Sequence, residues 1–174
     1  MTTFREVQKF RVRWAWLAVI AMNILFIYAI IQQIIIGRPF GSKPAPSFVL
    51  LLVEALLLGL LFFISSIKLI TVYDSSGIQY KFSPFQFKFK TIAWQDLQDA
   101  YIRQYNSFFE YGGYGMRYGT AKTGHAINTS QSCNKGLQLR FKNGKLLLIG
   151  TKDPGAIQKI LDEAIIAGKI NRIY

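Results

Sequence analysis

The sequence predicts a membrane-embedded α-helical hairpin followed by a mainly β domain. Three observations predict this fold class. Two apolar stretches of 23 residues, 14–36 and 48–70, lie near the start of the chain. After them, hydrophobic and polar residues alternate, as they do in half-buried strands. The last segment, residues 154–167, returns to helical spacing and would close the domain.

Each apolar stretch is long enough to cross a bilayer. At about 1.5 Å per residue each would extend roughly 35 Å, against a hydrocarbon core of about 30 Å. Backbone groups in lipid must be bonded within the segment, so both stretches are predicted to be helices. Residues 37–46 between them are rich in Gly and Pro, which favours a tight return. The first stretch lacks the small residues of a signal-peptidase site, so we expect it to be retained.

The distribution of basic residues places both termini in the cytoplasm. Segment 1–13 holds four Lys and Arg residues, and the hairpin loop holds two. Four more lie at or just after the end of the second stretch, namely Lys68, Lys81, Lys88 and Lys90. By the positive-inside rule this bias puts the loop outside and both ends inside.

Segment 1–13 is predicted to be a basic juxtamembrane segment. Within it Phe4, Val7 and Phe10 recur every three residues, with basic residues between them. This spacing suits a short amphipathic helix lying among the lipid headgroups before the chain enters the membrane.

Among the polar residues within the apolar stretches, Asn23, Gln33 and Glu54 are the candidates for a role inside the membrane. Polar groups at membrane depth are costly and call for a reason. Antiparallel pairing would place Glu54 level with about residue 30, within a turn of Tyr28 and Gln33. Glu54 would then hold the two helices together, contact a helix of another subunit, or serve an ion or proton pathway. We favour the first, because no partner charge lies at the same depth.

Residues 71–174 are predicted to form one cytoplasmic domain. Alternation at 78–82, 85–89 and 137–141 predicts strands. Asn143-Gly144 between two apolar runs predicts a two-residue hairpin turn of type I′. In the final helix, Asp153 can cap the N-terminus, Pro154 suits the first position and Gly168 suits the end.

The order of these pieces resembles bacterial membrane proteins in which a two-helix transmembrane hairpin precedes a pleckstrin-homology-like (PH-like) domain. The resemblance implies an antiparallel sandwich or barrel of two roughly orthogonal sheets, closed by the C-terminal helix, and no enzymatic activity. With the charge bias, it indicates a protein of the bacterial inner (cytoplasmic) membrane. It carries over no lipid-binding residue. The matching pieces are TVYDSSGI at 71–78, IAWQDL at 92–97, GGYGMR at 112–117, GLQL at 136–139, Gly144-Lys145, and Ile149-Gly150-Thr151 before the Pro154 helix.

The most unusual segment, residues 105–119, holds six aromatic residues and four glycines. Exposed aromatics there would contact headgroups or a protein partner. Alternatively, the segment folds its aromatics over the open end of the domain. The candidate contact residues are Phe108, Phe109, Tyr111, Tyr114, Arg117 and Tyr118, with Lys81, Lys88 and Lys90 on the basic strands.

Several kinds of chemistry have little support in the sequence. Gly113-x-Gly115 lacks the rest of a dinucleotide fingerprint. His125 and Cys133, the only residues of their types, make neither a catalytic arrangement nor a metal site. Lys and Phe alternate over 85–90 and so should face opposite sides of a strand, unlike a base-stacking surface. We therefore expect no cofactor, metal, nucleic acid or small-molecule substrate.

The sequence thus favours a non-enzymatic, membrane-anchored scaffold or accessory subunit. Its cytoplasmic domain would bind another membrane protein, or the chain would associate with itself as a homo-oligomer. The alternative is a sensor of anionic lipid headgroups that uses the basic strands and the aromatic, Gly-rich loop. A small membrane enzyme has the least support.

Overall fold

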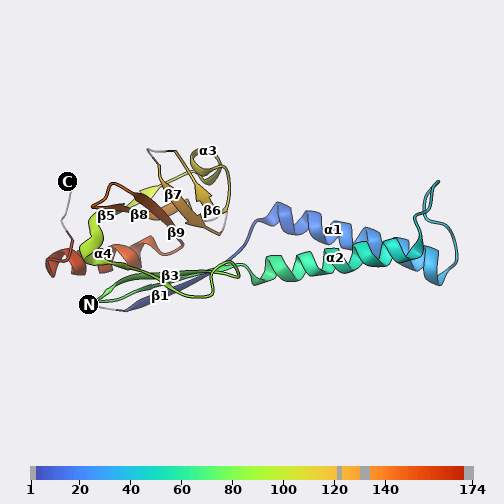
Figure 1. Ribbon diagram of the computed structural model, residues 1–174, viewed down its shortest axis with the longest axis horizontal. Helices are drawn as coiled ribbons and strands as arrows, with labels where there is room; N and C mark the ends of the chain where they lie inside the picture. The colour runs from blue at the N-terminus through green and yellow to red at the C-terminus, as the bar shows by residue number, and fades with distance from the viewer. Residues whose placement is uncertain (1–2, 121–122, 130–133, 171–174) are drawn as a thin grey trace. The chain divides into compact units, whose positions relative to one another are not determined.

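We analysed a computed structural model of the chain, which describes residues 3–120, 123–129 and 134–170. The chain divides into two compact units (Figure 1). The hairpin unit comprises Val12–Ser66. The β unit comprises the residues up to Arg11 together with those from Ile67 onward.

The hairpin unit consists of two antiparallel helices lying side by side (Figure 1). Helix α1 spans Arg13–Ile30 and continues as a π-helical segment, η1, over Ile31–Ile35; α2 spans Ser47–Ser66. Both are long and apolar enough to cross a membrane. Most of their side chains are exposed, unlike those of a core helix in a soluble protein. The buried side chains are Asn23, Ala29, Leu50 and Glu54.

The second helix ends four residues earlier than predicted, at Ser66. Strand β2, Lys68–Tyr73, begins two residues later and pairs on both of its sides. Ile67 and Leu69 are buried in the core of the β unit. Hydropathy alone did not separate these core residues from the span, because both environments select the same apolar side chains.

The first sheet has the order β1-β2-β3-β4, and all its neighbours are antiparallel. At one end of this sheet Lys9 lies opposite Lys68, and Lys68 lies opposite Ser83. At the other end, a turn at residues 74–77 joins β2 to β3, as the sequence predicted. The strands other than β2 are β1 Phe4–Lys9, β3 Gly77–Ser83 and β4 Lys90–Ala93.

The prediction of a juxtamembrane helix within residues 1–13 is wrong. Residues Phe4–Lys9 form β1, an edge strand of this sheet. Burial along it follows a period of two: Glu6 and Gln8 point inward, and Val7 between them is 47% exposed. The inward polar groups have partners. The Glu6 carboxylate accepts a hydrogen bond from the Thr151 hydroxyl (2.8 Å), and the Gln8 amide donates to the Gly150 carbonyl (2.6 Å). The helical spacing of the hydrophobic residues was therefore coincidental.

The second sheet has the order β5-β8-β9-β7-β6. Its β7–β9 pair is parallel and the others are antiparallel, so the sheet is mixed rather than wholly antiparallel as predicted. The described strands form two sheets and no closed barrel. The strands are β5 Leu97–Gln104, β6 Gly115–Tyr118, β7 His125–Asn128, β8 Lys135–Phe141 and β9 Leu146–Thr151.

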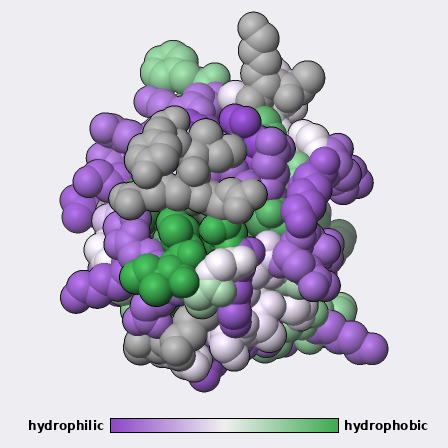
Figure 2. Space-filling view, turned by 90° about the vertical axis from the view of Figure 1, so that its left-hand side faces the viewer, coloured by the Kyte–Doolittle hydropathy of each residue, from purple (hydrophilic) through white to green (hydrophobic). Residues whose placement is uncertain are grey.

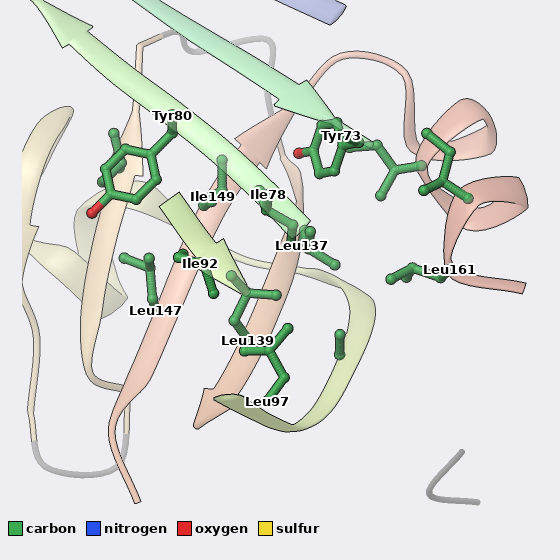
Figure 3. Packing of buried hydrophobic residues seen from close by; sticks show 14 of the residues in the cluster. Tyr73, Ile78, Tyr80, Ile92, Leu97, Leu137, Leu139, Leu147, Ile149 and Leu161 are labelled. Carbon is green, nitrogen blue, oxygen red and sulfur yellow. The ribbon is translucent and has the colours of Figure 1, made fainter. Parts of the chain in front are cut away.

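The hydrophobic core of the β unit lies between the two sheets and helix α4, Pro154–Ile166. Figure 3 shows Tyr73 and Ile78 from the first sheet, Leu137 from the second and Leu161 from α4 converging on it. The predicted start of α4 is confirmed, because the Asp153 carboxylate accepts a hydrogen bond from a backbone N–H of the first turn.

The hairpin between β8 and β9 is confirmed, but its predicted turn type is wrong. The Phe141 N–H donates to the Lys145 carbonyl, and the Gly144 N–H donates back to the Phe141 carbonyl, each at 2.9 Å. Gly144 has a φ of +81°, whereas no described residue other than glycine has a positive φ. A type I′ turn needs positive φ at both centres, so this is a three-residue loop with glycine in the left-handed position.

The strand predicted over Phe85–Phe89 is a loop. Pro84 has no N–H to offer a strand ladder. Gln86 then folds back on Phe82: its N–H donates to the Phe82 carbonyl (2.8 Å), and its side-chain oxygen accepts the Phe82 N–H (3.0 Å). The chain therefore leaves β3 just where the alternation of Phe and Lys begins.

Candidate functional site

The aromatic, Gly-rich segment contains a short helix, α3, spanning Ser107–Tyr111. The Asn106 side chain caps it by accepting hydrogen bonds from the N–H groups of Phe108 (3.0 Å) and Phe109 (3.1 Å). Gly112 ends it with a φ of +69°, a conformation that favours glycine. Local sequence signals thus fix both ends of this helix.

Arg103 on β5 ties α3 to the second sheet. Its guanidinium pairs with the Glu110 carboxylate (2.7 Å) and donates to the Tyr111 hydroxyl (2.8 Å) and the Gln138 side chain (2.9 Å). Burial works to lower the pKa of Arg103, but the hydrogen bonds and charge interactions with Glu110 and Tyr111 together outweigh it, and the pKa is raised. Burial also raises the pKa of Tyr111. The segment is therefore held by charge-assisted bonds.

The aromatic residues of the segment divide between core and surface. Tyr105 and Tyr111 are buried in a small second cluster, so the predicted contact residue Tyr111 serves packing instead. Phe108 is exposed, and Phe109 and Tyr118 are 92% and 83% exposed. The segment therefore folds part of its aromatic surface inward and leaves part of it outside.

The Phe85–Phe89 loop exposes both kinds of side chain that were predicted to face opposite sides. Phe85 and Phe89 are exposed, and Phe87 is 88% exposed. Lys88 is exposed as well, and the Lys81 ammonium lies 5.9 Å from the centre of the Phe89 ring. The result is a mixed aromatic and cationic surface.

This loop follows the end of the first sheet at which the chain passes to and from the hairpin unit. Ser83, its last strand residue, pairs with Lys68, and Lys68 pairs with Lys9. Lys68 lies two residues after Ser66, the end of α2. Lys9 lies four residues before Arg13, the start of α1. Lys9 and Lys68, at this end of the sheet, are therefore each only a few residues along the chain from a helix of the hairpin unit. The face shown in Figure 2 is by contrast mostly hydrophilic, with hydrophobic residues gathered near its centre.

A basic pocket of about 310 Å³ lies where β3 and β4 of the first sheet meet β6, β7 and β9 of the second. Its charged residues are Lys90, Arg117 and Lys145, with His125 beside them, and no Asp or Glu lines it. The His125 ring packs edge-on against Tyr118, with centroids 4.5 Å apart. We call this the basic pocket; its other lining residues are Tyr80, Gln86, Met116, Ala126, Ile127, Phe141, Leu146 and Leu147.

Tyr80 supplies a hydroxyl at the inner wall of the basic pocket. Figure 3 shows its ring at the margin of the core, on the same side as Leu147, which also lines the pocket. Burial raises the pKa of Tyr80. The hydroxyl is therefore protonated at neutral pH and can donate a hydrogen bond to an anion.

A second, apolar cavity of about 240 Å³ adjoins the basic pocket, and Met116 and Arg117 line both. Its floor includes Phe82 and Phe85, whose rings stack with centroids 5.6 Å apart. We call this the apolar cavity; Phe10, Ile67, Tyr114 and Gly115 complete its lining.

Asn23 and Glu54 of the hairpin unit are buried and Gln33 is half-buried, and their polar groups are unequally satisfied. The Gln33 amide donates to the Ala45 carbonyl (2.6 Å), and the Asn23 amide donates to the Val19 carbonyl (2.7 Å). Glu54 is 7% exposed, and both its carboxyl oxygens are buried with no hydrogen-bond partner among the described residues.

The helix register differs from the prediction. Gln33 of the first helix bonds Ala45, just before α2, so residue 33 lies level with about residue 46. Counting along both helices puts Glu54 level with about residue 25. Glu54 therefore lies within a turn of Asn23, and not of Gln33 as predicted. The sequence estimate failed because α2 begins close beside the last turn of the first helix.

A protein-family model described as a family of unknown function (DUF6141) matches residues 1–168. The chain belongs to this family. The match runs through both helices and the strands, so the hairpin unit and the β unit are parts of one family architecture. A search of curated proteins gave no match.

Sequence reasoning about this DUF6141 member missed Tyr80, His125 and Lys145 as site residues. Tyr80 is on β3, His125 begins β7 and Lys145 directly precedes β9, so the pairing of β7 with β9 brings the last two together. No short motif marks such a pocket. Among the described residues no three His, Cys, Asp or Glu side chains gather as a metal site, and Cys133 lies outside those residues.

Proposed function

We propose that this DUF6141 protein is a non-enzymatic, membrane-anchored scaffold or accessory subunit. Its two helices span the bacterial cytoplasmic membrane, both termini lie in the cytoplasm, and the β unit is a PH-like domain. The length of the helices, their largely exposed apolar side chains and the basic residues at their inner ends support this proposal.

Single-cysteine labelling tests the topology. In a Cys133→Ser background, a cysteine at Ser42 in the hairpin loop should react with a membrane-impermeant maleimide in intact cells. A cysteine at Lys142, exposed in the β8–β9 turn, should react only after permeabilisation. The reverse pattern would contradict the proposed orientation.

The β unit binds a protein partner through the exposed side of the α3 segment. The observation that carries this proposal is Phe109, 92% exposed on a helix that Asn106 and Arg103 hold in place. A large apolar ring in water is unfavourable. Rigid aromatic anchors contribute strongly to binding because little conformational entropy is lost. The partner is another membrane protein or a second copy of this chain.

Site-specific photocrosslinking in cells tests this surface. A benzophenone amino acid at Phe109 should give one discrete protein adduct. The same amino acid at Lys159, exposed on α4, should not. Phe109→Ala should abolish co-purification of that adduct's partner while the melting temperature stays unchanged. Equal crosslinking from both positions would contradict a specific docking surface.

A second candidate function is binding of anionic lipid headgroups through the Phe85–Phe89 loop. It is favoured by the exposed rings and lysines of this loop and by its connection to the inner ends of the helices. Each lysine near an anionic leaflet contributes about 1 kcal/mol.

An environment-sensitive dye tests the lipid contact. It is attached to a cysteine at Phe87 in full-length Cys133→Ser protein in nanodiscs. Its emission should shift to the blue when phosphatidylglycerol is added to phosphatidylcholine, and salt should reverse the shift. The dye at Lys142 is the matched control. No difference between the two positions would remove this candidate.

A further inference from the structure

We propose that the basic pocket and the apolar cavity form one binding site for a single anionic phospholipid. Its phosphate would lie in the basic pocket, and part of one acyl chain would lie in the apolar cavity. The proposal rests on membrane anchoring, but it goes beyond surface contact: one lipid molecule leaves the leaflet in part and is held by the fold.

The charge of the basic pocket favours an anion. Lys90, Arg117 and Lys145 bring three permanent positive charges to its wall, and no carboxylate lines it. None of the three pairs with a carboxylate among the described residues. Like charges gathered in a partly enclosed site raise the local positive potential and attract anions. Phosphate oxygens would accept hydrogen bonds from all three and from the neutral Tyr80 hydroxyl.

The geometry of the pocket gives this charge a fixed position. Arg117 is held by a hydrogen bond from its Nε to the Tyr114 carbonyl (2.9 Å), which leaves its terminal nitrogens for a ligand. Lys145 follows the left-handed Gly144, and Lys90 begins β4. Three different elements of both sheets thus supply the cations. A volume of about 310 Å³ lies within the size range of pockets that bind small molecules.

The apolar cavity adds the second half of the site. It shares Met116 and Arg117 with the basic pocket, so charge and hydrophobic surface meet at these two residues. The Gln86 amide lies 3.6 Å from the Met116 sulfur and so joins the Phe85–Phe89 loop to β6. Both residues line the basic pocket. A ligand that satisfies both cavities must carry an anionic group at one end and an apolar chain at the other.

The position of the apolar cavity along the chain points to a lipid rather than a free anion. Ile67, in its lining, directly follows Ser66, the last residue of α2. Phe10, also in the lining, donates its N–H to the Ile67 carbonyl (3.1 Å). An acyl chain would fill this mostly apolar cavity, whereas free phosphate would make no use of it.

Native mass spectrometry of full-length protein tests the site. The protein is released from nanodiscs of phosphatidylcholine that contain a minor fraction of phosphatidylglycerol. We expect one phosphatidylglycerol to be retained per chain, in preference to phosphatidylcholine. Lys90→Gln combined with Lys145→Gln should lower that retention by about tenfold or more. The control, Lys142→Gln with Lys152→Gln, removes two exposed lysines that line neither cavity and should retain the lipid.

A second variant separates a lipid from free phosphate. Met116→Trp should fill the junction of the two cavities, so lipid retention should fall while any binding of inorganic phosphate, followed by calorimetry, stays unchanged. Equal lipid retention in the charge variant and its control would overturn the proposal. Phosphate binding without selective lipid retention would also overturn it and would assign an anion site only. Failure to enter nanodiscs would instead contradict membrane anchoring.

Discussion

Two aromatic surfaces of the β unit are built in different ways. The α3 segment is capped by Asn106, ended by Gly112 and fixed by Arg103, and it buries two of its tyrosines. The Phe85–Phe89 loop has no regular secondary structure and exposes all three of its phenylalanines. The first is suited to a partner of fixed shape. The second is suited to a fluid surface such as a lipid leaflet.

The largest loss of stability should come from removing the guanidinium that fixes α3, because the Phe85–Phe89 loop has no comparable support. Arg103→Ala leaves Glu110 and Tyr111 without their shared partner. We expect a loss of about 2–3 kcal/mol in the free energy of unfolding. Arg140→Ala, an exposed arginine on the neighbouring strand β8, is the control and should change little. Denaturant titration of both variants checks this, and equal losses would contradict the proposed role of Arg103.

A smaller loss should follow from a change at the end of α3. Gly112→Val forces a β-branched residue into a φ of +69°, although no neighbour lies within 4 Å of the added Cβ. The expected cost is about 1–3 kcal/mol, all of it from backbone strain. Gly112→Asn should cost less, because asparagine tolerates the left-handed region. Thermal unfolding of both variants checks this. Equal losses in melting temperature would contradict backbone strain as the cause.

The pH dependence of stability should also distinguish α3 from the loop. The pKa of Tyr111 is raised above its ordinary value of 10.0 in the folded state. The folded protein therefore holds this proton more tightly, and the associated stability is complete below pH 10 and is lost as the pH rises through the folded pKa. Unfolding free energies measured across this range should fall less steeply for Tyr111→Phe than for the wild type. Parallel curves would contradict a role for this hydroxyl.

The smallest effect on stability should come from the loop itself. Phe87→Ala removes a ring that is 88% exposed, so the free energy of unfolding should change by less than about 0.5 kcal/mol. The same variant should weaken the contact of the loop with anionic lipid. This contact is measured in the full-length protein with the environment-sensitive dye on a cysteine at Lys88, whose salt-sensitive shift should be lost. A large loss of stability would mean that Phe87 packs within the fold.

Elements with complete local signals were predictable from the sequence. The Asp153 cap and the Asn143-Gly144 turn each depend on adjacent residues, and both appear where expected. Strand β1 was missed because the residues it pairs with in β2 lie 59 to 69 positions further along the chain, and because its hydrophobic spacing imitates a helix. The Phe85–Phe89 alternation was misleading because Gln86 ends the strand.

The candidate site was only partly predictable. Phe108, Phe109 and Tyr118 are exposed, as a contact surface requires, whereas Tyr111 is buried, as expected if the segment folds its aromatics inward. The basic pocket was not predictable, because Lys90 begins β4 of the first sheet, His125 begins β7 of the second and Lys145 precedes β9, so the three meet only through tertiary packing. Tertiary pairing of this kind leaves no mark at short sequence separation.

The pairing of β1 with β2 has a consequence for the order of folding. The first strand leaves the ribosome before the hairpin, yet the ladder between Lys9 and Lys68 cannot close until the whole hairpin has been made. Until then the polar groups of Glu6 and Gln8 must stay in water. Once the two helices lie antiparallel, they hold both strand ends together and reduce the entropic cost of closing so long a loop. Folding of the β unit therefore depends on the hairpin, and a chain whose hairpin does not form would present an unpaired strand edge to chaperones and proteases.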